Sequence, residues 1–218
     1  ATLRAVNLAA LWPQAPVTQL HGTLQAGPTS GGAGTAGSEG WSLQAALRND
    51  LPGPWDATRL PLTALDASAN YDGTRWTVPS ATLQAGTGSI TAQGQYTPAT
   101  HALEGQATLR ALRPDTLHTL LAAAPLSGRV TAQTQGEAVR FSADVRADTG
   151  IAARATTTKT PAASGAPLRI NAFSTQGTWQ AADGGTVRLD RLLLDALQAR
   201  VEATGLQVSL GTQSAQGK

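Results

Sequence analysis

The chain has 218 residues, no cysteine and no methionine, a net charge of +2, and only 14% charged and 4% aromatic side chains. The lack of cysteine excludes disulfides and cysteine metal sites, and the arginines stand singly among acidic residues, which argues against a nucleic-acid-binding surface. The chain contains no run of 18 apolar residues that would predict a membrane span, and its first residues do not form a signal peptide. We therefore expect a processed protein or a piece of a longer polypeptide, with any anchor outside this sequence.

Apolar residues recur two apart along most of the chain, which is the period of a β-strand with one apolar and one polar face. The pattern is clearest from Ser80 to Ala111, where turns at Gly86 to Gly88 and at Pro98 to Thr100 separate three strands. In chain order, strands are predicted over residues 2–8, 17–26, 41–47, 60–71, 76–85, 90–96, 103–111, 130–132, 139–147 and 168–179, and within 187–210. The last segment also fits a helical stripe, but we interpret it as strands with shifts of phase.

One segment has the signals of a helix. Arg113-Pro114-Asp115-Thr116 is a good helix start, leucines follow at positions 117, 120 and 121, and Pro125 would end the helix. We therefore predict one short helix near 114–123 that plugs an end or covers an edge of the sheet.

About a dozen strands with turns every 8 to 14 residues or so predict an all-β protein, which could be a sandwich, a barrel or an elongated meander. Because the repeats vary in length, we favour a continuous antiparallel meander that curls on itself. Residues 1–154 are expected to form one β-segment with a flexible loop at 28–40, residues 155–167 a flexible loop or weak joint, and residues 168–218 a continuation of the same sheet.

Motifs for catalysis are weak. Residues 32–37 match G-x-G-x-x-G, but the chain continues with a period of two instead of a helix, so a nucleotide site is not expected. The histidines His21, His101 and His118 have no metal-ligand partners at suitable spacing, and no nucleophile stands beside a base. The sequence thus predicts no enzyme, no metal and no cofactor. The five tryptophans are interpreted as core or edge caps in preference to carbohydrate-stacking platforms.

The apolar stripe is the strongest functional signal. In a closed sandwich such a stripe only forms a core, whereas in an open trough it would face an acyl chain. The residues alone leave both interpretations open.

Four motifs carry a resemblance to a known family. They are N-D-L-P-G-x-W at Asn49 to Trp55, R-L-P-L at Arg59 to Leu62, G-x-G-x-I-x-A-x-G at Gly86 to Gly94, and L-x-P-x-x-L followed by P-L-S-G within Leu112 to Gly128. Over roughly residues 45 to 148 the sequence resembles the TamB family of AsmA-like proteins.

The resemblance implies a U-shaped antiparallel sheet, or β-taco, with an apolar inner face, in a periplasmic protein anchored in the inner membrane of a diderm bacterium by an N-terminal helix missing here. It implies phospholipid transport between the two membranes and outer-membrane biogenesis with a barrel partner of the TamA type. The expected partners are phospholipid acyl chains and no nucleic acid. The predicted lining is Leu83, Ile90, Leu109, Val130, Phe141 and Val145. Alternatives are a scaffold that pairs edge strands with outer-membrane or autotransporter clients and, more distantly, a carbohydrate-binding or adhesin-like domain.

Overall fold

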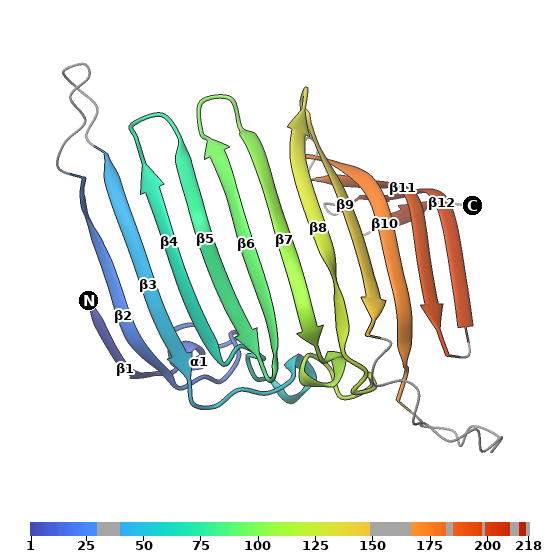
Figure 1. The fold of residues 1–218 in the computed structure, drawn as a ribbon, viewed down its shortest axis with the longest axis horizontal. Helices are drawn as coiled ribbons and strands as arrows, with labels where there is room; N and C mark the ends of the chain where they lie inside the picture. Colours follow the sequence, from blue (N-terminus) through green and yellow to red (C-terminus); the bar gives the residue numbers. More distant parts are fainter. Residues whose placement is uncertain (30–39, 149–166, 182–184, 198, 210–213, 217–218) are drawn as a thin grey trace.

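A computed structural model describes residues 1–29, 40–148, 167–181, 185–197, 199–209 and 214–216. These residues form one antiparallel sheet of 13 strands in which each strand pairs with the next one in the sequence (Figure 1). The strands are β1 (Thr2–Val6), β2 (Leu20–Pro28), β3 (Trp41–Asn49), β4 (Ala64–Tyr71), β5 (Trp76–Ala85), β6 (Gly88–Thr97), β7 (Ala102–Leu112), β8 (Leu126–Gln135), β9 (Ala138–Ala147), β10 (Ile170–Gln180), β11 (Thr186–Ala196), β12 (Ala199–Ser209) and β13 (Ser214–Gln216). The prediction of an all-β antiparallel meander is confirmed.

The sheet is a single open layer. The first and the last strand lie at opposite edges, and β11 and β12 curl behind the upper ends of β8 and β9 in the view of Figure 1. Because β9 pairs with β10, the strands on either side of residues 148–169 belong to one ladder. The expected flexible segments 28–40 and 155–167 lie almost entirely outside the described residues.

The short helix predicted near 114–123 is present as a single 3-10 turn, η2 (Pro114–Thr116), which is shorter than predicted and is followed by an irregular loop. The α-helix of the described residues is instead α1 (Leu8–Leu11), where the Asn7 side chain accepts a hydrogen bond from the Ala9 amide at 3.1 Å and so caps the first turn. A second 3-10 turn, η1, covers Trp55–Ala57.

The ambiguous C-terminal segment consists of strands, as predicted. β11 pairs with β10 with a shift of register, because Gln176 lies opposite Arg191 and Gly177 lies opposite Leu189. Asp190 is the extra residue of this β-bulge. Because of this extra residue, the apolar side chains on both sides of the bulge lie on the same face of the sheet. The extra residue also explains the change in apolar spacing that made the segment resemble a helix.

One end of the sheet, at the bottom of Figure 1, is covered by the loops 7–19, 50–63 and 113–125, which we call the capped end. Backbone hydrogen bonds join these loops, from the Val17 amide to the Thr58 carbonyl at 2.8 Å and from the Trp55 amide to the Leu117 carbonyl at 3.0 Å. The buried apolar side chains of the described part lie at or near the strand ends on this side, namely Leu20, Ala85, Leu112, Leu126, Val145 and Ala196. The small core of the protein is therefore at the capped end.

Asn49 is the main polar group of that core and is only 5% exposed. Its side-chain oxygen accepts hydrogen bonds from the Gln19 and Leu51 amides, and its side-chain nitrogen donates to the Leu60 and Leu62 carbonyls, at 3.1 to 3.3 Å. One side chain thus satisfies backbone groups of two of the three loops.

Candidate functional site

Apolar side chains form four rows that cross the strands on one face of the sheet, which we call the apolar face. Each row follows from the strand registers, which place residues of like size opposite one another. The leucine row, nearest the capped end, is Leu47, Leu65, Leu83, Ile90, Leu109, Gly128, Val145, Phe173, Leu194 and Val201. The alanine row is Ala45, Ala67, Ala81, Ala92, Ala107, Val130, Ala143, Thr175, Leu192 and Ala203.

The remaining two rows lie toward the other end of the strands. The glycine row is Leu43, Ala69, Val78, Gly94, Gly105, Ala132, Phe141, Gly177, Leu189 and Leu206. The aromatic row is Trp41, Tyr71, Trp76, Tyr96, Leu103, Val139, Trp179, Val187 and Val208, interrupted on β8 by the polar Thr134, which lies opposite Val139. Ala69 of β4 lies opposite Leu43 of β3 but has no direct partner on β5, because β5 bulges at Val78 and Pro79.

The order of the rows makes a furrow that runs across the strands. Large side chains of the leucine and aromatic rows form its walls, and the small residues of the alanine and glycine rows form its floor, most clearly from β4 to β8. A hollow of about 360 Å³ lies in this part, lined on the furrow side by Trp76, Val78, Ala92, Gly94, Tyr96, Leu103, Gly105, Ala107, Val130 and Ala132. This volume falls within the range of small-ligand pockets.

The apolar face carries no second layer of structure in the described part of the chain. Trp41 and Trp179 of the aromatic row remain 42% and 39% exposed, and no large side chain is fully buried. The interpretation of these tryptophans as core is therefore wrong, although their place at strand ends fits the edge-cap alternative. Tyr71 and Trp76 stack with ring centroids 4.9 Å apart, which fixes part of the wall.

All six residues predicted to line a groove lie on the apolar face. Leu83, Ile90 and Leu109 are direct neighbours on three adjacent strands. Val145 belongs to the same row beyond Gly128, and the other two lie in the alanine and glycine rows. Val145 is only 7% exposed, because it lies close to the capped end.

Sequence reasoning missed the furrow itself, including its alanine and glycine floor. The missed signal is the order of side-chain sizes along each strand, as in Ile90, Ala92, Gly94 and Tyr96 of β6. β7 has the same order in reverse, with Leu103, Gly105, Ala107 and Leu109. In a hairpin the second strand reads the pattern backwards, so equal sizes meet across the sheet.

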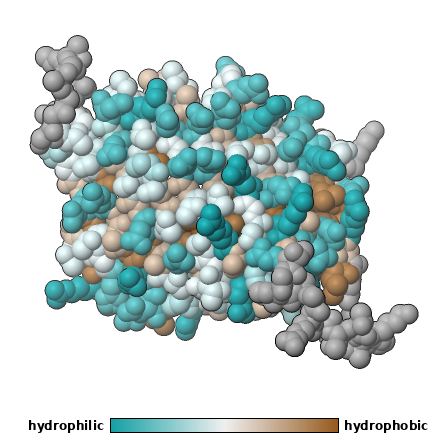
Figure 2. Space-filling model, in the orientation of Figure 1, coloured by the Kyte–Doolittle hydropathy of each residue, from teal (hydrophilic) through white to brown (hydrophobic). Residues whose placement is uncertain are grey.

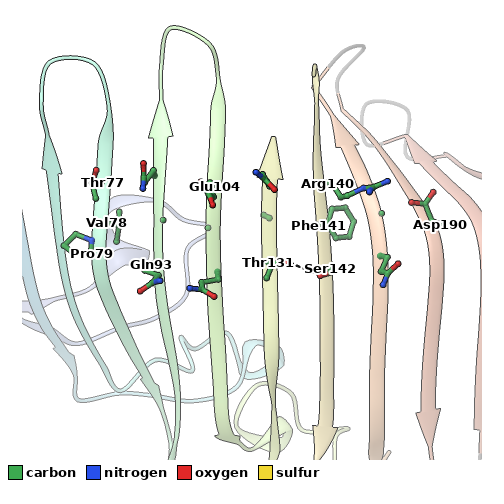
Figure 3. Close-up of a pocket in the computed structure, with 18 residues that line it drawn as sticks. Thr77, Val78, Pro79, Gln93, Glu104, Thr131, Arg140, Phe141, Ser142 and Asp190 are labelled. Carbon is green, nitrogen blue, oxygen red and sulfur yellow. Dashed lines mark hydrogen bonds between the residues drawn. The ribbon is translucent and has the colours of Figure 1, made fainter. Parts of the chain in front are cut away.

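The opposite face is polar. The surface turned toward the viewer in Figure 2 belongs to this face and is mostly hydrophilic or neutral in colour. A hollow of about 810 Å³ crosses its middle, and Figure 3 shows glutamine, threonine and serine side chains from several strands along it, with Val78 and Phe141 also among its lining residues. Thr131 and Ser142 are hydrogen-bonded to each other there at 2.8 Å.

Ion pairs lie at the capped end and along the strands β9, β11 and β12. Asp56 accepts hydrogen bonds from the hydroxyl and the amide of Thr119, and these bonds lower the pKa of its carboxyl group. The His118 Nδ1 lies 3.8 Å from Asp56 Oδ2, and His21 Nε2 lies 3.2 Å from Asp50 Oδ2. Two of the three histidines thus have a carboxylate neighbour that sequence spacing did not reveal.

The described residues contain no group of three or more His, Cys, Asp or Glu side chains that could hold a metal ion. Among the same residues no helix is long and apolar enough to cross a bilayer. Comparisons with protein-family models, with curated proteins and with solved structures found no match.

Proposed function

We propose that the apolar face holds phospholipid acyl chains and guides them along the sheet. The observation that carries this proposal is the furrow: it runs at right angles to the strands, has a floor of apolar residues and glycines interrupted only by Thr175, and is not covered by a second layer in the described part. A closed sandwich would use the same residues as a core, but the described residues form no partner sheet that would bury them.

The dimensions of the furrow suit a lipid. The furrow is clearest over the five strands from β4 to β8, and strands in a sheet are about 4.8 Å apart, so this part extends for about 19 Å measured along the sheet. The hydrocarbon core of a bilayer is about 30 Å thick and holds two acyl chains end to end, so one chain needs about 15 Å. One extended acyl chain can therefore lie in this part of the furrow.

The energetics favour such a path. Each methylene group transferred from water to an apolar surface contributes about 0.8 kcal/mol, so a diacyl lipid with about 30 methylenes faces a barrier above about 20 kcal/mol in water. The furrow removes much of this barrier. Its floor carries one hydroxyl, that of Thr175, which is 8% exposed and donates to the Arg191 carbonyl at 3.1 Å. In the wall, the Tyr71 hydroxyl donates to the Gly73 carbonyl at 2.7 Å, and the Tyr96 hydroxyl is hydrogen-bonded to His101 Nδ1 at 3.2 Å.

In the cell, this activity would belong to a periplasmic protein anchored in the inner membrane, which passes phospholipids toward the outer membrane with an outer-membrane barrel partner. The resemblance at Asn49 to Trp55 and at Gly86 to Gly94 supports this setting. The chemistry needs no catalytic residue and no cofactor, because transfer along an apolar surface breaks no bond.

Photo-crosslinking tests the proposal. A photoreactive amino acid at Leu83, Ile90 or Phe141 should capture phospholipid in a diderm bacterium, whereas the same group at Gln84 or Ser142, on the polar face of the same strands, should not. Equal labelling of the two faces would contradict a furrow for lipids.

A blocking variant gives an independent measurement. Ala107→Asp places a charge on the floor of the furrow, and Thr108→Asp places the same charge on the polar face one residue away. With purified protein and a fluorescent phosphatidylethanolamine, Ala107→Asp should abolish binding and Thr108→Asp should retain it. Equal affinities of the two variants would show that lipid binds elsewhere.

A further inference from the structure

The hollow in the furrow ends at β8. On the furrow side, residues of β5, β6, β7 and β8 line it, and none of β9 or β10 does. These four neighbouring strands span about 14 Å, at about 4.8 Å from one strand to the next. The sheet nevertheless continues without a break, because β9 pairs with β8 along its whole length and β10 pairs with β9. Side chains, and not the backbone, therefore close the hollow at this point.

The floor of the furrow rises where β8 meets β9. Along the glycine row, Gly94, Gly105 and Ala132 lie on β6, β7 and β8, and the next residue, on β9, is Phe141. The chain has two phenylalanines, and the other one, Phe173, belongs to the leucine row, which forms a wall. Phe141 is therefore the one aromatic ring in the two floor rows.

The ring of Phe141 lies over Gly177 of β10, which is its direct partner. A Cβ atom added to Gly177 would come within 3.0 Å of the Phe141 Cζ, whereas the nearest atoms to such a Cβ at Gly94 and Gly105 belong to the backbone. Gly177 is buried, while Gly94 and Gly105 are half-buried. Figure 3 shows the Phe141 ring between β9 and β10. This one ring thus covers the part of the floor that Gly177 would otherwise leave open.

Without the ring, the floor would stay low as far as β10. This strand contributes Gly177 and Thr175 to the two floor rows, and β11 contributes Leu189 and Leu192 opposite them. A small residue at position 141 would therefore extend the furrow across β9 and β10, by about 10 Å, until it reaches these two leucines. One side chain decides whether the furrow ends at β8 or at β10.

We propose that Phe141 sets the length of the acyl chain that the furrow holds. This inference rests on the proposed function, since it takes the acyl chain to lie along the hollow. One acyl chain of a bilayer needs about 15 Å, half the thickness of the hydrocarbon core, and the strands that line the hollow span about 14 Å. The hollow therefore fits one chain of ordinary membrane length, and a longer chain meets the ring of Phe141.

Competition binding with fatty acids of different length tests this role. Dodecanoate, hexadecanoate and eicosanoate each displace a fluorescent hexadecanoate analogue from the purified protein. A methylene in an open furrow buries about half of its surface, so each one should tighten binding about twofold. For the natural chain, the affinity should rise from dodecanoate to hexadecanoate and then stay level. For Phe141→Ala, eicosanoate should bind about tenfold more tightly than hexadecanoate.

Two further variants separate the position of the ring from its effect on packing. Phe173→Ala removes the same ring from the leucine row, opposite Val145 of β9, and should leave the affinity level beyond hexadecanoate. Ala132→Phe adds a ring to the floor one strand earlier, which shortens the hollow by about 5 Å, so dodecanoate should then bind as tightly as hexadecanoate. Circular dichroism spectra of all variants should match that of the natural chain.

The outcomes distinguish this inference from the proposed function. If the natural chain and Phe141→Ala bind fatty acids with the same dependence on length, Phe141 does not set the length, although the furrow still holds lipid. A gain for eicosanoate in Phe173→Ala as large as in Phe141→Ala would also overturn the inference, because the effect would then come from looser packing. If the natural chain binds none of the fatty acids, the proposed function is itself contradicted, and the inference with it.

Discussion

Replacing Asn49 should unfold the capped end more readily than any other polar substitution of comparable size. This side chain makes four hydrogen bonds to the loops 7–19 and 50–63 and is 5% exposed, so water cannot replace the lost partners. At about 0.5 to 1.5 kcal/mol for each hydrogen bond, Asn49→Ala should lower the free energy of unfolding by about 2 to 6 kcal/mol. That is a large fraction of the stability of an ordinary domain.

Urea denaturation followed by tryptophan fluorescence measures this effect, with Asn70→Ala as the matched control. Asn70 lies on β4 and is exposed, so the same substitution there should change the free energy of unfolding by less than about 0.5 kcal/mol. Asn49→Asp is more specific, because a carboxylate would face the Leu60 and Leu62 carbonyls, and its cost should grow as the pH rises. A loss below about 1 kcal/mol for Asn49→Ala would refute the role given to this side chain.

Three further predictions concern the turns, the floor and the loops. Hydrogen bonds from the hydroxyl and amide of Thr74 and from the next amide lower the pKa of Asp72 from 3.8 to about 2. The stabilisation of this hairpin turn should thus be complete above pH 3.8 and lost as the pH falls through about 2, as measured by NMR of the Thr74 amide. Gly94→Ala should destabilise the sheet, since a Cβ would lie 2.7 Å from a backbone carbonyl oxygen, whereas Gly27→Ala, with open space, should be neutral in thermal unfolding. Asp56→Ala should speed hydrogen exchange of the loop 113–125 without affecting the hairpins at the other end.

The strands and the meander were predictable because period-two alternation and turn residues are local signals. The local structure of residues 114–123 was not predictable in this way. Its leucines have helical spacing, but the backbone there bonds to other segments: the Leu117 carbonyl accepts from Trp55, and the Leu120 carbonyl accepts from Leu168. Tertiary hydrogen bonds outweighed local helix propensity, which is weak by comparison.

The membership of the apolar face was also predictable, since alternation assigns each side chain to a face. The furrow was not predictable, because it depends on which residues of neighbouring strands lie opposite one another. That register is set by the length of each turn and by the β-bulges, such as the one at Val78 and Pro79. In the sequence, a bulge is visible only as a shift in the alternation of apolar and polar residues. This shift does not show which of two paired strands carries the extra residue.

The sheet consists of hairpins that are joined only to their immediate neighbours, since the extensive contacts between strands are all between consecutive ones. Duplicating or deleting one hairpin would leave the ladders on both sides in their original alignment. The reach of such a protein can therefore change in evolution by whole units of two strands, about 10 Å at a time, without redesign of any interior.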